Sequence, residues 1–594
     1  MNKYKEYQQL DLPQIDRDLL EFWKERQIFE KSMSEREDAP SFVFFEGPPS
    51  ANGKPGIHHV LARSVKDVFC RFQTMQGKLV RRKAGWDTHG LPIELAVEKQ
   101  LQITKEDIGH KISVDDYNKA CKETVMLYKD MWDELTVKMG YWVDMSEPYI
   151  TYENNYIESV WWLLNKLYNE DLLYKGYTIQ PYSPAAGTGL STHELNMPGC
   201  YKDVTDTTVV AQFKVKPNKL LPEDTFILAW TTTPWTLPSN TALCVGPKID
   251  YVLVKTYNQY TGEPMHIVLA KALVGKQLSG KYQESSEELP LEGYELGNKR
   301  IPYTIVGAYK GTDLIGLSYE QLLPFAQPDD QSMVPFRVIG GNFVTTADGT
   351  GIVHIAPTFG GDDAMVAKQA DIPPMLVKNE QGDLVPLVDL QGKFRPEMGE
   401  YAGAYVKNEY YKAGEAPEKS IDVQLAIQLK TENKAFKVEK YKHSYPHCWR
   451  TDKPVLYYPL DSWFVKATAK KKRMSELNKT INWKPASTGE KRFGGWLDNL
   501  QDWNLSRSRY WGIPLPIWRT EDERQERCIG SIEELQQAVE EANKVLNLSQ
   551  EVPKDLHRPY IDAVVLVSAD GKKMYRETDL IDVWFDSGLS LIHI

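Results

Sequence analysis

The chain has 594 residues, of which 42% are hydrophobic and 26% charged, and its formal net charge is −11. One hydrophobic core rarely supports so long a chain, so we expect several globular domains. The acidic balance argues against a broad surface that coats a polyanion, although a local basic patch such as residues 470–473 would suffice to hold one.

The cysteines indicate a reducing compartment. There are six, with no CxxC pair among them: Cys70, Cys121, Cys200, Cys244, Cys448 and Cys528. This pattern gives no disulfide framework and predicts a cytoplasmic protein. The N-terminal residues 1–14 have no apolar signal core, and no run of the sequence is long enough to span a bilayer.

The first part of the chain predicts a nucleotide site. We expect a charged helical arm over 1–40 and the first half of a Rossmann-type domain over 41–155. Residues 45–59 read FEGPPSANGKPGIHH, after an apolar β-type run at 42–45. The helix that follows has apolar residues at i, i+3, i+4 and i+7, namely Val65, Val68, Phe69 and Phe72. A strand, a Gly/Pro loop and a helix N-terminus together favour phosphate binding.

The character of the sequence changes near residue 200. After a connective segment at 156–200, short β-type runs separated by Gly/Pro turns continue to about 400: Phe226–Trp230, Tyr251–Lys255, His266–Ala270, Tyr303–Val306 and Ile352–Ile355. They predict a β-rich domain over 201–400, inserted into the α/β domain. A second connective segment at 401–480 leads into 481–594, the start of the second half of the α/β domain.

Five further motifs carry a family resemblance. They are GWDTHGLPIE at 85–94, WTTTPWTLPSN at 230–240, GTGIVHIAPTFGGDD at 349–363, DWNLSRSRYWG at 502–512 and DVWFDSG at 582–588. Together with 45–59, and in this order, they resemble the isoleucyl-tRNA synthetases of class I. The resemblance implies a doubly wound parallel sheet interrupted by an editing domain. It also implies ATP-dependent activation of isoleucine with Mg²⁺, transfer to tRNA(Ile), hydrolytic editing of valyl-tRNA, and a monomer with no membrane partner.

The ATP signature departs from the family. The usual spelling is His, any residue, Gly, His, whereas this chain has Gly56, Ile57, His58 and His59. By resemblance the ATP-binding residues are Gly47, Pro49, Asn52, Gly53, Gly56 and His59, and the catalytic ones are Gly56, His58 and His59. We expect His58 or His59 to donate to phosphate. The alternative is that one histidine only caps the helix.

The motif at 85–94 resembles the amino-acid pocket. Asp87 would pair with the substrate ammonium, because a partly desolvated cation needs an opposite charge. By resemblance Pro48 and Trp584 flank the aliphatic side chain. The plainer alternatives are a helix N-cap for Asp87 and core packing for Trp584.

A second site is expected because an isoleucine pocket rejects valine weakly. One methylene is worth about 1–3 kcal/mol, the known figure for this family's own discrimination. By resemblance Asp363 holds the ammonium of the misattached amino acid, and the remaining residues line the pocket and position ester and water: Thr231, Thr232, Thr233 and His354. The alternatives are ordinary strand threonines, an N-cap at Asp362 or Asp363, and a satisfied strand histidine.

Two features of the family are missing. Its zinc knuckle uses two CxxC pairs, and the matching places here are Ser183, Ala186, Cys448 and Thr451, so we expect no structural zinc. The chain ends at 591–594, soon after DVWFDSG, without a KMSKS loop or an anticodon-binding domain. We therefore expect an N-terminal fragment that is incompetent for synthesis alone and whose last residues need not be native. The alternatives are a stand-alone hydrolase of mischarged tRNA and a non-catalytic tRNA-binding fragment.

Overall fold

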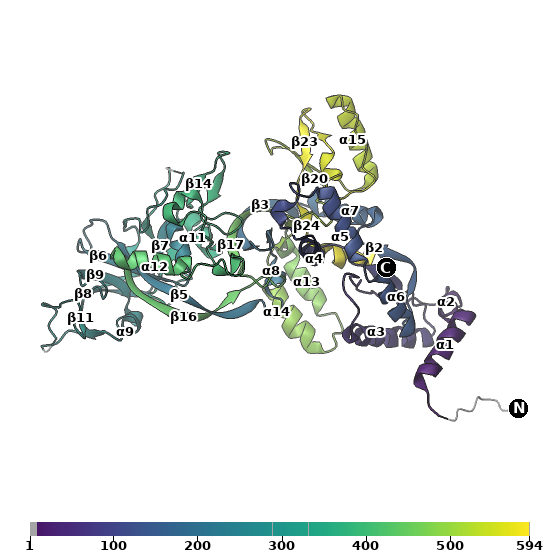
Figure 1. Ribbon diagram of the computed structural model, residues 1–594, viewed down its shortest axis with the longest axis horizontal. Helices are drawn as coiled ribbons and strands as arrows, with labels where there is room; N and C mark the ends of the chain where they lie inside the picture. The colour runs from purple at the N-terminus through teal and green to yellow at the C-terminus, as the bar shows by residue number, and fades with distance from the viewer. Residues whose placement is uncertain (1–8, 288, 331, 593–594) are drawn as a thin grey trace. The chain divides into compact units, whose positions relative to one another are not determined.

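The computed structural model describes residues 9–287, 289–330 and 332–592 (Figure 1). It divides into two compact units: unit 1 is Met1–Tyr174 with Trp463–Ile594, and unit 2 is Lys175–Ser462. Unit 1 is therefore built from two distant segments of the sequence. Unit 2 extends beyond the predicted insert at both ends, and the finer six-part division remains a prediction. The expectation about the last residues falls partly on 593–594, which lie outside the described residues, as do the first eight of the predicted arm.

Unit 1 combines helices with short strands. Its helices are α1 (Leu12–Arg26), α2 (Ile28–Ser34), α3 (Ile57–Met75), α4 (Leu91–Leu101), α5 (Val114–Val125), α6 (Lys129–Lys138), α7 (Asn154–Asn169), α13 (Lys471–Asn478), α14 (Gly494–Asp498), α15 (Ile532–Leu546) and α16 (Val583–Gly588). Strands β1 (Lys83–Trp86) and β2 (Asp144–Ile150) pair in parallel, with Gly85 opposite Tyr149. Parallel pairing across helical connections is the arrangement of α/β domains.

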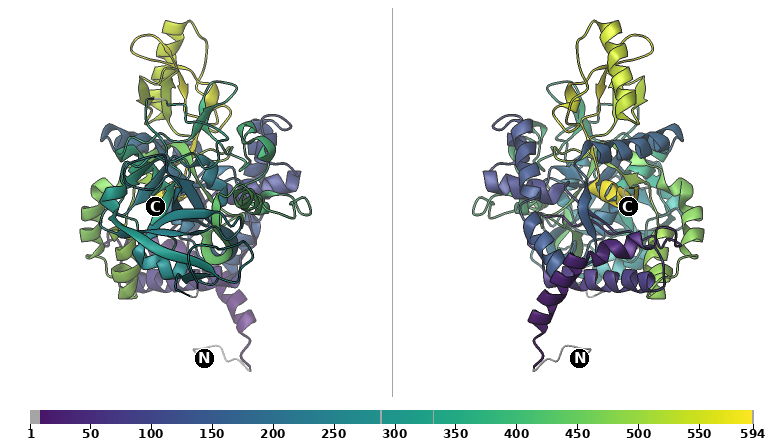
Figure 2. Two further views of the ribbon diagram at one scale, coloured as in Figure 1. Left: turned by 90° about the vertical axis from the view of Figure 1, so that its left-hand side faces the viewer. Right: turned by 90° about the vertical axis from the view of Figure 1, so that its right-hand side faces the viewer.

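The later segment of unit 1 adds two small sheets. In the first, β19 (Ser506–Arg507) and β24 (Leu580–Ile581) are antiparallel. The second has the order β21-β20-β23-β22, with bounds Glu526–Cys528, Ile517–Thr520, Lys573–Arg576 and Leu566–Val567. Helix α15 packs against β22 of this sheet, and the two form one lobe (Figure 2).

The core of unit 1 is centred on α7. Its buried residues Ile157, Val160, Trp161 and Leu164 repeat at i, i+3, i+4 and i+7, as expected for one buried helix face. They pack with residues of the second segment, because Trp161 contacts Trp518 edge to face and its indole N–H donates to the carbonyl of Pro514 at 2.8 Å. The two distant segments of unit 1 thus share one core.

The strand predicted at 42–45 does not form. Only Ser41 makes a β-bridge, to Leu79, and the N–H of Phe42 donates to the carbonyl of Leu79 at 2.8 Å. Beyond this point the run has no neighbouring strand, and Val43 is 65% exposed. A strand needs a ladder of inter-strand hydrogen bonds, so an apolar sequence alone does not make one.

The helix predicted after the loop is confirmed as α3. Its apolar face is exposed rather than packed, since the exposed fractions of its large apolar side chains all exceed one half: Ile57, Leu61, Val65, Val68, Phe69, Phe72 and Met75. Periodicity therefore predicted the helix correctly but does not by itself specify whether the apolar face is buried.

Unit 2 is built around a seven-stranded sheet (Figure 1). Its order is β10 (Tyr282–Glu284), β11 (Ile301–Lys310), β8 (Asp250–Tyr257), β9 (Pro264–Ala270), β6 (Thr225–Thr231), β5 (Tyr201–Lys214) and β16 (Ala435–Pro446). A three-stranded sheet has the order β12 (Arg337–Gly340), β7 (Ala242–Val245) and β13 (Ile352–Ile355). All five β-type runs predicted from the sequence lie in these strands, so the β-rich character is confirmed.

Both faces of the larger sheet are covered. On β5, Val209, Ala211 and Phe213 join one core cluster, whereas Val210 joins the cluster on the opposite face. This is the two-residue period of a strand buried on both sides. Helix α12 (Ile421–Thr431) packs along β5, as Figure 1 shows.

The other elements of unit 2 are short. They are α8 (Thr192–Leu195), α9 (Val274–Gln277), α10 (Gly311–Leu314), α11 (Gly361–Gln369), β4 (Thr188–Gly189), β14 (Leu376–Lys378) and β15 (Leu384–Pro386). Strands β3 (Leu173–Ser183) and β17 (Leu456–Val465) contain the division points of the chain, and β18 is Trp503–Asn504. Among the described residues, no helix is both long enough and apolar enough to cross a membrane.

Candidate functional site

The Gly/Pro loop of unit 1 ends at a helix that His59 caps. Gly56 is the N-cap of α3, and its N–H donates to Nδ1 of His59 at 2.9 Å. The N–H of His59 donates in return to the carbonyl of Gly56 at 3.0 Å. The capping alternative is therefore realised for His59. Capping uses only Nδ1 of His59, so Nε2 remains available for a ligand.

The protonation of His59 follows from this contact. Burial lowers the pKa of His59, and the nearby His58 and Arg63 lower it further, so the ring is neutral near pH 7. A neutral imidazole whose Nδ1 accepts a hydrogen bond carries its proton on Nε2. His59 can thus cap the helix and still donate to a ligand.

A cavity of about 380 Å³ opens beside the loop. It is lined by five of the predicted ATP-binding residues, Gly47, Pro49, Asn52, Gly53 and His59. Gly56 and His58 are not among its lining residues; His58 is exposed, and its ring is tilted by 45° to that of His59, with centroids 3.8 Å apart. The lining also includes Lys54, Arg63 and Lys66, three cationic residues to which the sequence motifs assigned no role.

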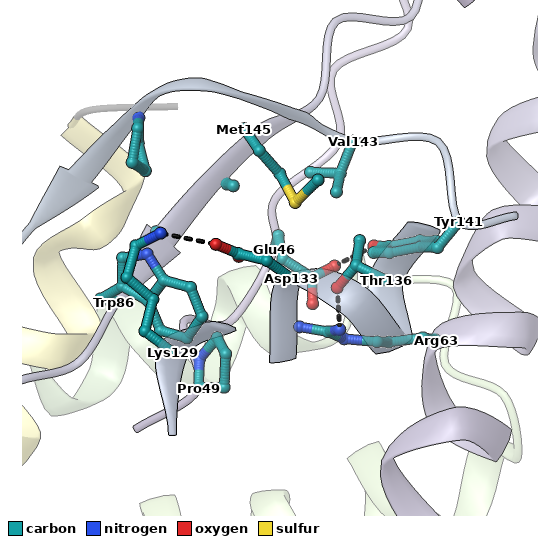
Figure 3. Close-up of a pocket in the computed structure, with 13 residues that line it drawn as sticks. Glu46, Pro49, Arg63, Trp86, Lys129, Asp133, Thr136, Tyr141, Val143 and Met145 are labelled. Atoms are coloured by element: carbon teal, nitrogen blue, oxygen red, sulfur yellow. Dashed lines mark hydrogen bonds and ion pairs between the residues drawn. The ribbon is translucent and has the colours of Figure 1, made fainter. Parts of the chain in front are cut away.

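Behind this cavity, a polar cluster holds Arg63 in place (Figure 3). The guanidinium of Arg63 donates to Oγ1 of Thr136 at 2.7 Å and lies over the ring of Trp132, 5.0 Å from its centroid. The hydroxyl of Tyr141 donates to Glu46 at 2.5 Å, and Nζ of Lys66 lies 2.8 Å from the same carboxylate. A buried cation held by polar partners gives this wall a fixed positive charge, which suits a phosphate.

Asp87 follows β1 directly and is tied to the loop, because its N–H donates to the carbonyl of Pro49 at 3.0 Å. Burial raises its pKa well above the usual range, and the carboxyl of Asp586 raises it further. Oδ1 of Asp87 and Oδ1 of Asp586 are both buried and have no hydrogen-bond partner among the described residues. Two buried carboxyls with unused oxygens suit a cationic ligand.

The positions of the other two residues predicted for this pocket give less support to their predicted roles. Pro48 is partly buried in the loop, and Trp584 is 37% exposed near the start of α16. Trp584 does not belong to the core, so the packing alternative does not describe it. That both residues flank an aliphatic side chain remains a prediction.

In unit 2 the structure brings all five predicted editing residues together. They line one cavity of about 540 Å³: Thr231, Thr232, Thr233, His354 and Asp363. Thr231 ends β6, His354 lies on β13 and Asp363 lies in the first turn of α11. Three elements thus converge on one cavity, with Trp230, Phe343 and Phe359 as aromatic lining.

The threonines form a compact turn directly before the short helix η2 (Pro234–Ser239). Oγ1 of Thr231 accepts the N–H of Thr233 at 3.0 Å and lies 3.3 Å from the hydroxyl of Thr233. Thr232 lines the cavity between them. Thr231 is the last ladder residue of β6, opposite Val209, and its side-chain hydrogen bond turns the chain so that Thr232 and Thr233 lie outside the strand.

His354 is held at both ring nitrogens. The hydroxyl of Thr236 donates to the carbonyl of Thr233, so it accepts from Nε2–H of His354 at 2.9 Å. Asn240 donates its amide to Nδ1 at 3.3 Å, and the hydroxyl of Tyr319 fixes that amide's orientation by donating to Oδ1 at 2.7 Å. Burial lowers the pKa of His354 to about 4. This histidine is a neutral part of the wall, with no nitrogen free to act as a base.

The carboxyl of Asp363 is bound to the backbone just before α11, and because the N-cap of that helix is Gly360, the N-cap alternative is not realised. Oδ2 of Asp363 accepts the N–H of Ala356 at 2.8 Å, and burial raises its pKa to about 6 despite that hydrogen bond. A Cβ at Gly360 would come within 2.7 Å of Cγ of Asp363, so the carboxyl uses the space that the glycine leaves. Near pH 7 the group is ionised but poorly solvated, as a site for an ammonium requires.

Three of the four positions of the expected zinc knuckle make hydrogen bonds, whereas Oγ1 of Thr451 is buried without a partner among the described residues. The hydroxyl of Ser183 accepts the N–H of Ala186 at 3.2 Å, and the N–H of Cys448 donates to the carbonyl of Lys453 at 2.8 Å. Within residues 9–287, 289–330 and 332–592, no three His, Cys, Asp or Glu side chains are grouped to hold a metal. The absence of zinc stays a prediction.

Comparison with known proteins places this architecture in a family. The chain belongs to the tRNA synthetases of class I (I, L, M and V), whose family model matches residues 18–593. This confirms the resemblance drawn from the motifs and, with the two units described above, the predicted α/β fold class interrupted by a β-rich insert.

Among curated proteins, similar relatives carry the name isoleucine–tRNA ligase. The one from Cytophaga hutchinsonii is 62% identical over 596 residues, covering 99% of this chain and 53% of the relative. The one from Bacteroides fragilis is 60% identical over 624 residues, covering 99% and 54%. The one from Clostridium tetani is 43% identical over 576 residues, covering 97% and 49%. The chain thus spans about half the length of the curated relatives it matches.

Proposed function

We propose that this chain is the N-terminal part of an isoleucine–tRNA ligase, which activates isoleucine with ATP, transfers it to tRNA(Ile) and hydrolyses valyl-tRNA. Family membership and the names of the relatives support the ligase. The observation that carries the editing activity is the single cavity of unit 2 lined by Thr231, Thr232, Thr233, His354 and Asp363.

In the synthetic site, the chain positions reactants and offsets negative charge. His59 donates from Nε2 to an ATP phosphate while its Nδ1 keeps the N-terminus of α3 in place. Lys54 and Arg63 supply positive charge around the same cavity, whereas Lys66 is paired with Glu46. Mg²⁺ arrives with ATP as part of the substrate. Asp87 and Asp586 receive the ammonium of isoleucine, which supplies the partner that their buried oxygens lack.

In the editing site, the ammonium of the misattached valine pairs with Asp363. The ester then lies along the threonine turn, whose hydroxyls hold the ester and a water molecule. His354 shapes the wall but does not take a proton, because both its nitrogens are engaged. Hydrolysis therefore depends on a positioned water and the hydroxyls of the terminal adenosine rather than on a protein nucleophile.

Amino-acid-dependent ATP–pyrophosphate exchange on the protein as its gene encodes it tests the ligase. We expect isoleucine to support exchange best, valine to be weaker by a factor on the order of 10² and leucine weaker still. Exchange with valine or leucine equal to that with isoleucine would reject the assignment.

A second reading is a stand-alone hydrolase of mischarged tRNA, favoured by a unit 2 that has its own core and its own cavity. A third is a tRNA-binding fragment. If the protein of residues 1–594 deacylates valyl-tRNA(Ile) but does not support pyrophosphate exchange, the hydrolase is favoured. If it binds tRNA(Ile) and has neither activity, the tRNA-binding fragment is favoured.

A further inference from the structure

Four side chains of unit 1 form one continuous row of hydrogen bonds. Nδ1 of His557 lies 2.5 Å from Oδ1 of Asp555, Nε2 of His557 lies 2.9 Å from Nε2 of His89, and Nδ1 of His89 lies 2.9 Å from Oδ2 of Asp586. We call these four residues the relay. Asp586 and both histidines are buried, whereas the side chain of Asp555 is 37% exposed. The relay thus runs from the carboxyls beside Asp87 to the protein surface.

The contact between the two rings fixes a proton count. Two nitrogens 2.9 Å apart must share one proton, because two lone pairs or two N–H groups would repel each other. His89 and His557 therefore cannot both be imidazolium. They can both be neutral, or one can carry the charge.

The electrostatics of the four groups indicate where the protons rest. Burial, and then Asp582, raise the pKa of Asp586 well above its usual range. Burial lowers the pKa of His89 to about 3 and that of His557 to about 4. Burial alone would raise the pKa of Asp555, but the hydrogen bonds from His557 outweigh it and the pKa is lowered to about 2. With the pocket empty, these shifts favour a protonated Asp586, two neutral rings and an ionised Asp555.

Only one set of tautomers satisfies that state. Asp586 donates to Nδ1 of His89, Nε2–H of His89 donates to Nε2 of His557, and Nδ1–H of His557 donates to Asp555. Every contact then has one donor and one acceptor. The rings have little freedom to leave this row, because Trp511 stacks on His557 with centroids 4.7 Å apart and meets His89 at 5.2 Å.

We propose that the relay moves one proton from Asp586 to His557 when the ammonium of the amino acid binds beside Asp87 and Asp586, so that Asp586 becomes anionic without releasing its proton to solvent. The proposal rests on the ligase function proposed above. The O–H bond of Asp586 breaks as an N–H bond forms at Nδ1 of His89. The N–H bond at Nε2 of His89 breaks as one forms at Nε2 of His557. His557 becomes an imidazolium paired with Asp555, and the charge of the four groups stays at −1.

The surroundings favour this movement only when a cation is present. The charged groups that face the relay are Asp87, Glu94, Lys122 and Asp582. Asp582 disfavours ionisation of Asp586 in the empty pocket, because like charges repel. An ammonium between Asp87 and Asp586 reverses that balance, while Asp555 stabilises the proton at the far end. His89 and His557 act as positioning residues, since they touch no substrate atom.

The test is the number of protons released when isoleucine binds. Calorimetric titration in two buffers of different ionisation enthalpy measures that number in the protein as its gene encodes it. Burial raises the pKa of Asp87 as well, so any proton that Asp87 releases is common to the wild type and the variant. His557→Asn keeps a donor for Asp555 but breaks the row, so Asp586 must give its proton to solvent, and release should exceed that of the wild type by up to one proton per isoleucine. For each unit rise in pH, the KM for isoleucine in pyrophosphate exchange should fall by up to about tenfold more in His557→Asn than in the wild type, with kcat unchanged.

Two further variants separate the relay from a structural role. Asp555→Asn changes a partly exposed residue and should move proton release in the same direction by a smaller amount. His266→Asn removes a histidine of unit 2 that pairs with Asp224 at 2.8 Å, and it should leave release and the pH profile as in the wild type. A uniform rise of KM without a pH slope, or proton release by the wild type equal to that of His557→Asn, would overturn the relay alone. A wild type without isoleucine-dependent exchange would overturn the proposed function, and the relay's role with it.

Discussion

Nε2 of His354 lies 2.9 Å from the hydroxyl of Thr236, a residue outside the predicted editing set. The contact fixes the tautomer of the histidine because the same hydroxyl donates to the carbonyl of Thr233 at 2.9 Å. One threonine therefore joins the strand that carries His354 to the threonine turn.

Thr236→Val should destabilise this junction. The valine removes the acceptor of a buried N–H, and an unsatisfied buried donor costs about 1–3 kcal/mol. Thr236→Ser keeps the hydroxyl and is the matched control. The free energies of unfolding of the two variants, measured by denaturant titration, should differ by that amount, and equal values would show that the hydrogen bond does not hold the wall.

Asp363→Asn should stabilise unit 2 at pH 7.5. The pKa of Asp363 is raised from 3.8 to about 6, so the ionised carboxyl disfavours the folded state above pH 6. As the pH falls from 6 to 3.8 the folded state takes up a proton first, and stability rises. Asparagine keeps the acceptor for Ala356 without the charge. We expect it to be more stable by about 1–2 kcal/mol at pH 7.5 and equal to the wild type near pH 4.

The free energies of unfolding of the wild type and Asp363→Asn, measured at pH 7.5 and near pH 4, check the sign of this effect. A wild type as stable as Asp363→Asn at pH 7.5 would mean that the carboxyl is well solvated, contrary to its place above Gly360.

Gly360→Ala should displace the Asp363 carboxyl and abolish hydrolysis of valyl-tRNA(Ile). The added Cβ would stand 2.7 Å from Cγ of Asp363, whereas a Cβ at the neighbouring Gly361 meets no atom within 4 Å. Gly361→Ala is therefore the control and should keep the activity. Deacylation rates that are alike in the two variants would contradict the placement of the carboxyl.

His59→Asn should separate the two roles of His59. An asparagine can accept the N–H of Gly56 and so recover about 1 kcal/mol of capping, which His59→Ala loses. Neither variant has the Nε2–H, so both should lose exchange activity by about 10²-fold. Exchange rescued by His59→Asn would indicate that capping is all His59 contributes.

The sequence predicted some features of the fold and missed others for clear physical reasons. The runs 226–230 and 352–355 were predicted because alternation and turn residues are local signals. The strand at 42–45 was wrong because a strand also requires a neighbour, which no local pattern specifies. The apolar periodicity of α3 found the helix, but burial of its face depends on what packs there, and in this chain that face is exposed.

For the candidate sites too, some residues were predicted from sequence motifs, and others could be found only in the structure. The threonine turn, His354 and Asp363 were identified through motif resemblance, and the structure gathers them around one cavity. Arg63 carries no motif signal, and its place beside the nucleotide cavity depends on Thr136 and Trp132 of another helix. The contact between His89 and His557 joins residues 468 positions apart, which one sequence cannot reveal.

Deacylation of valyl-tRNA(Ile) by Asp363→Ala, with Asp362→Ala as the neighbouring control, tests most directly the claim that unit 2 holds a separate site for destroying errors. We expect Asp363→Ala to abolish hydrolysis and Asp362→Ala to keep it, with isoleucine-dependent exchange unchanged in both. Hydrolysis retained by Asp363→Ala would contradict that claim.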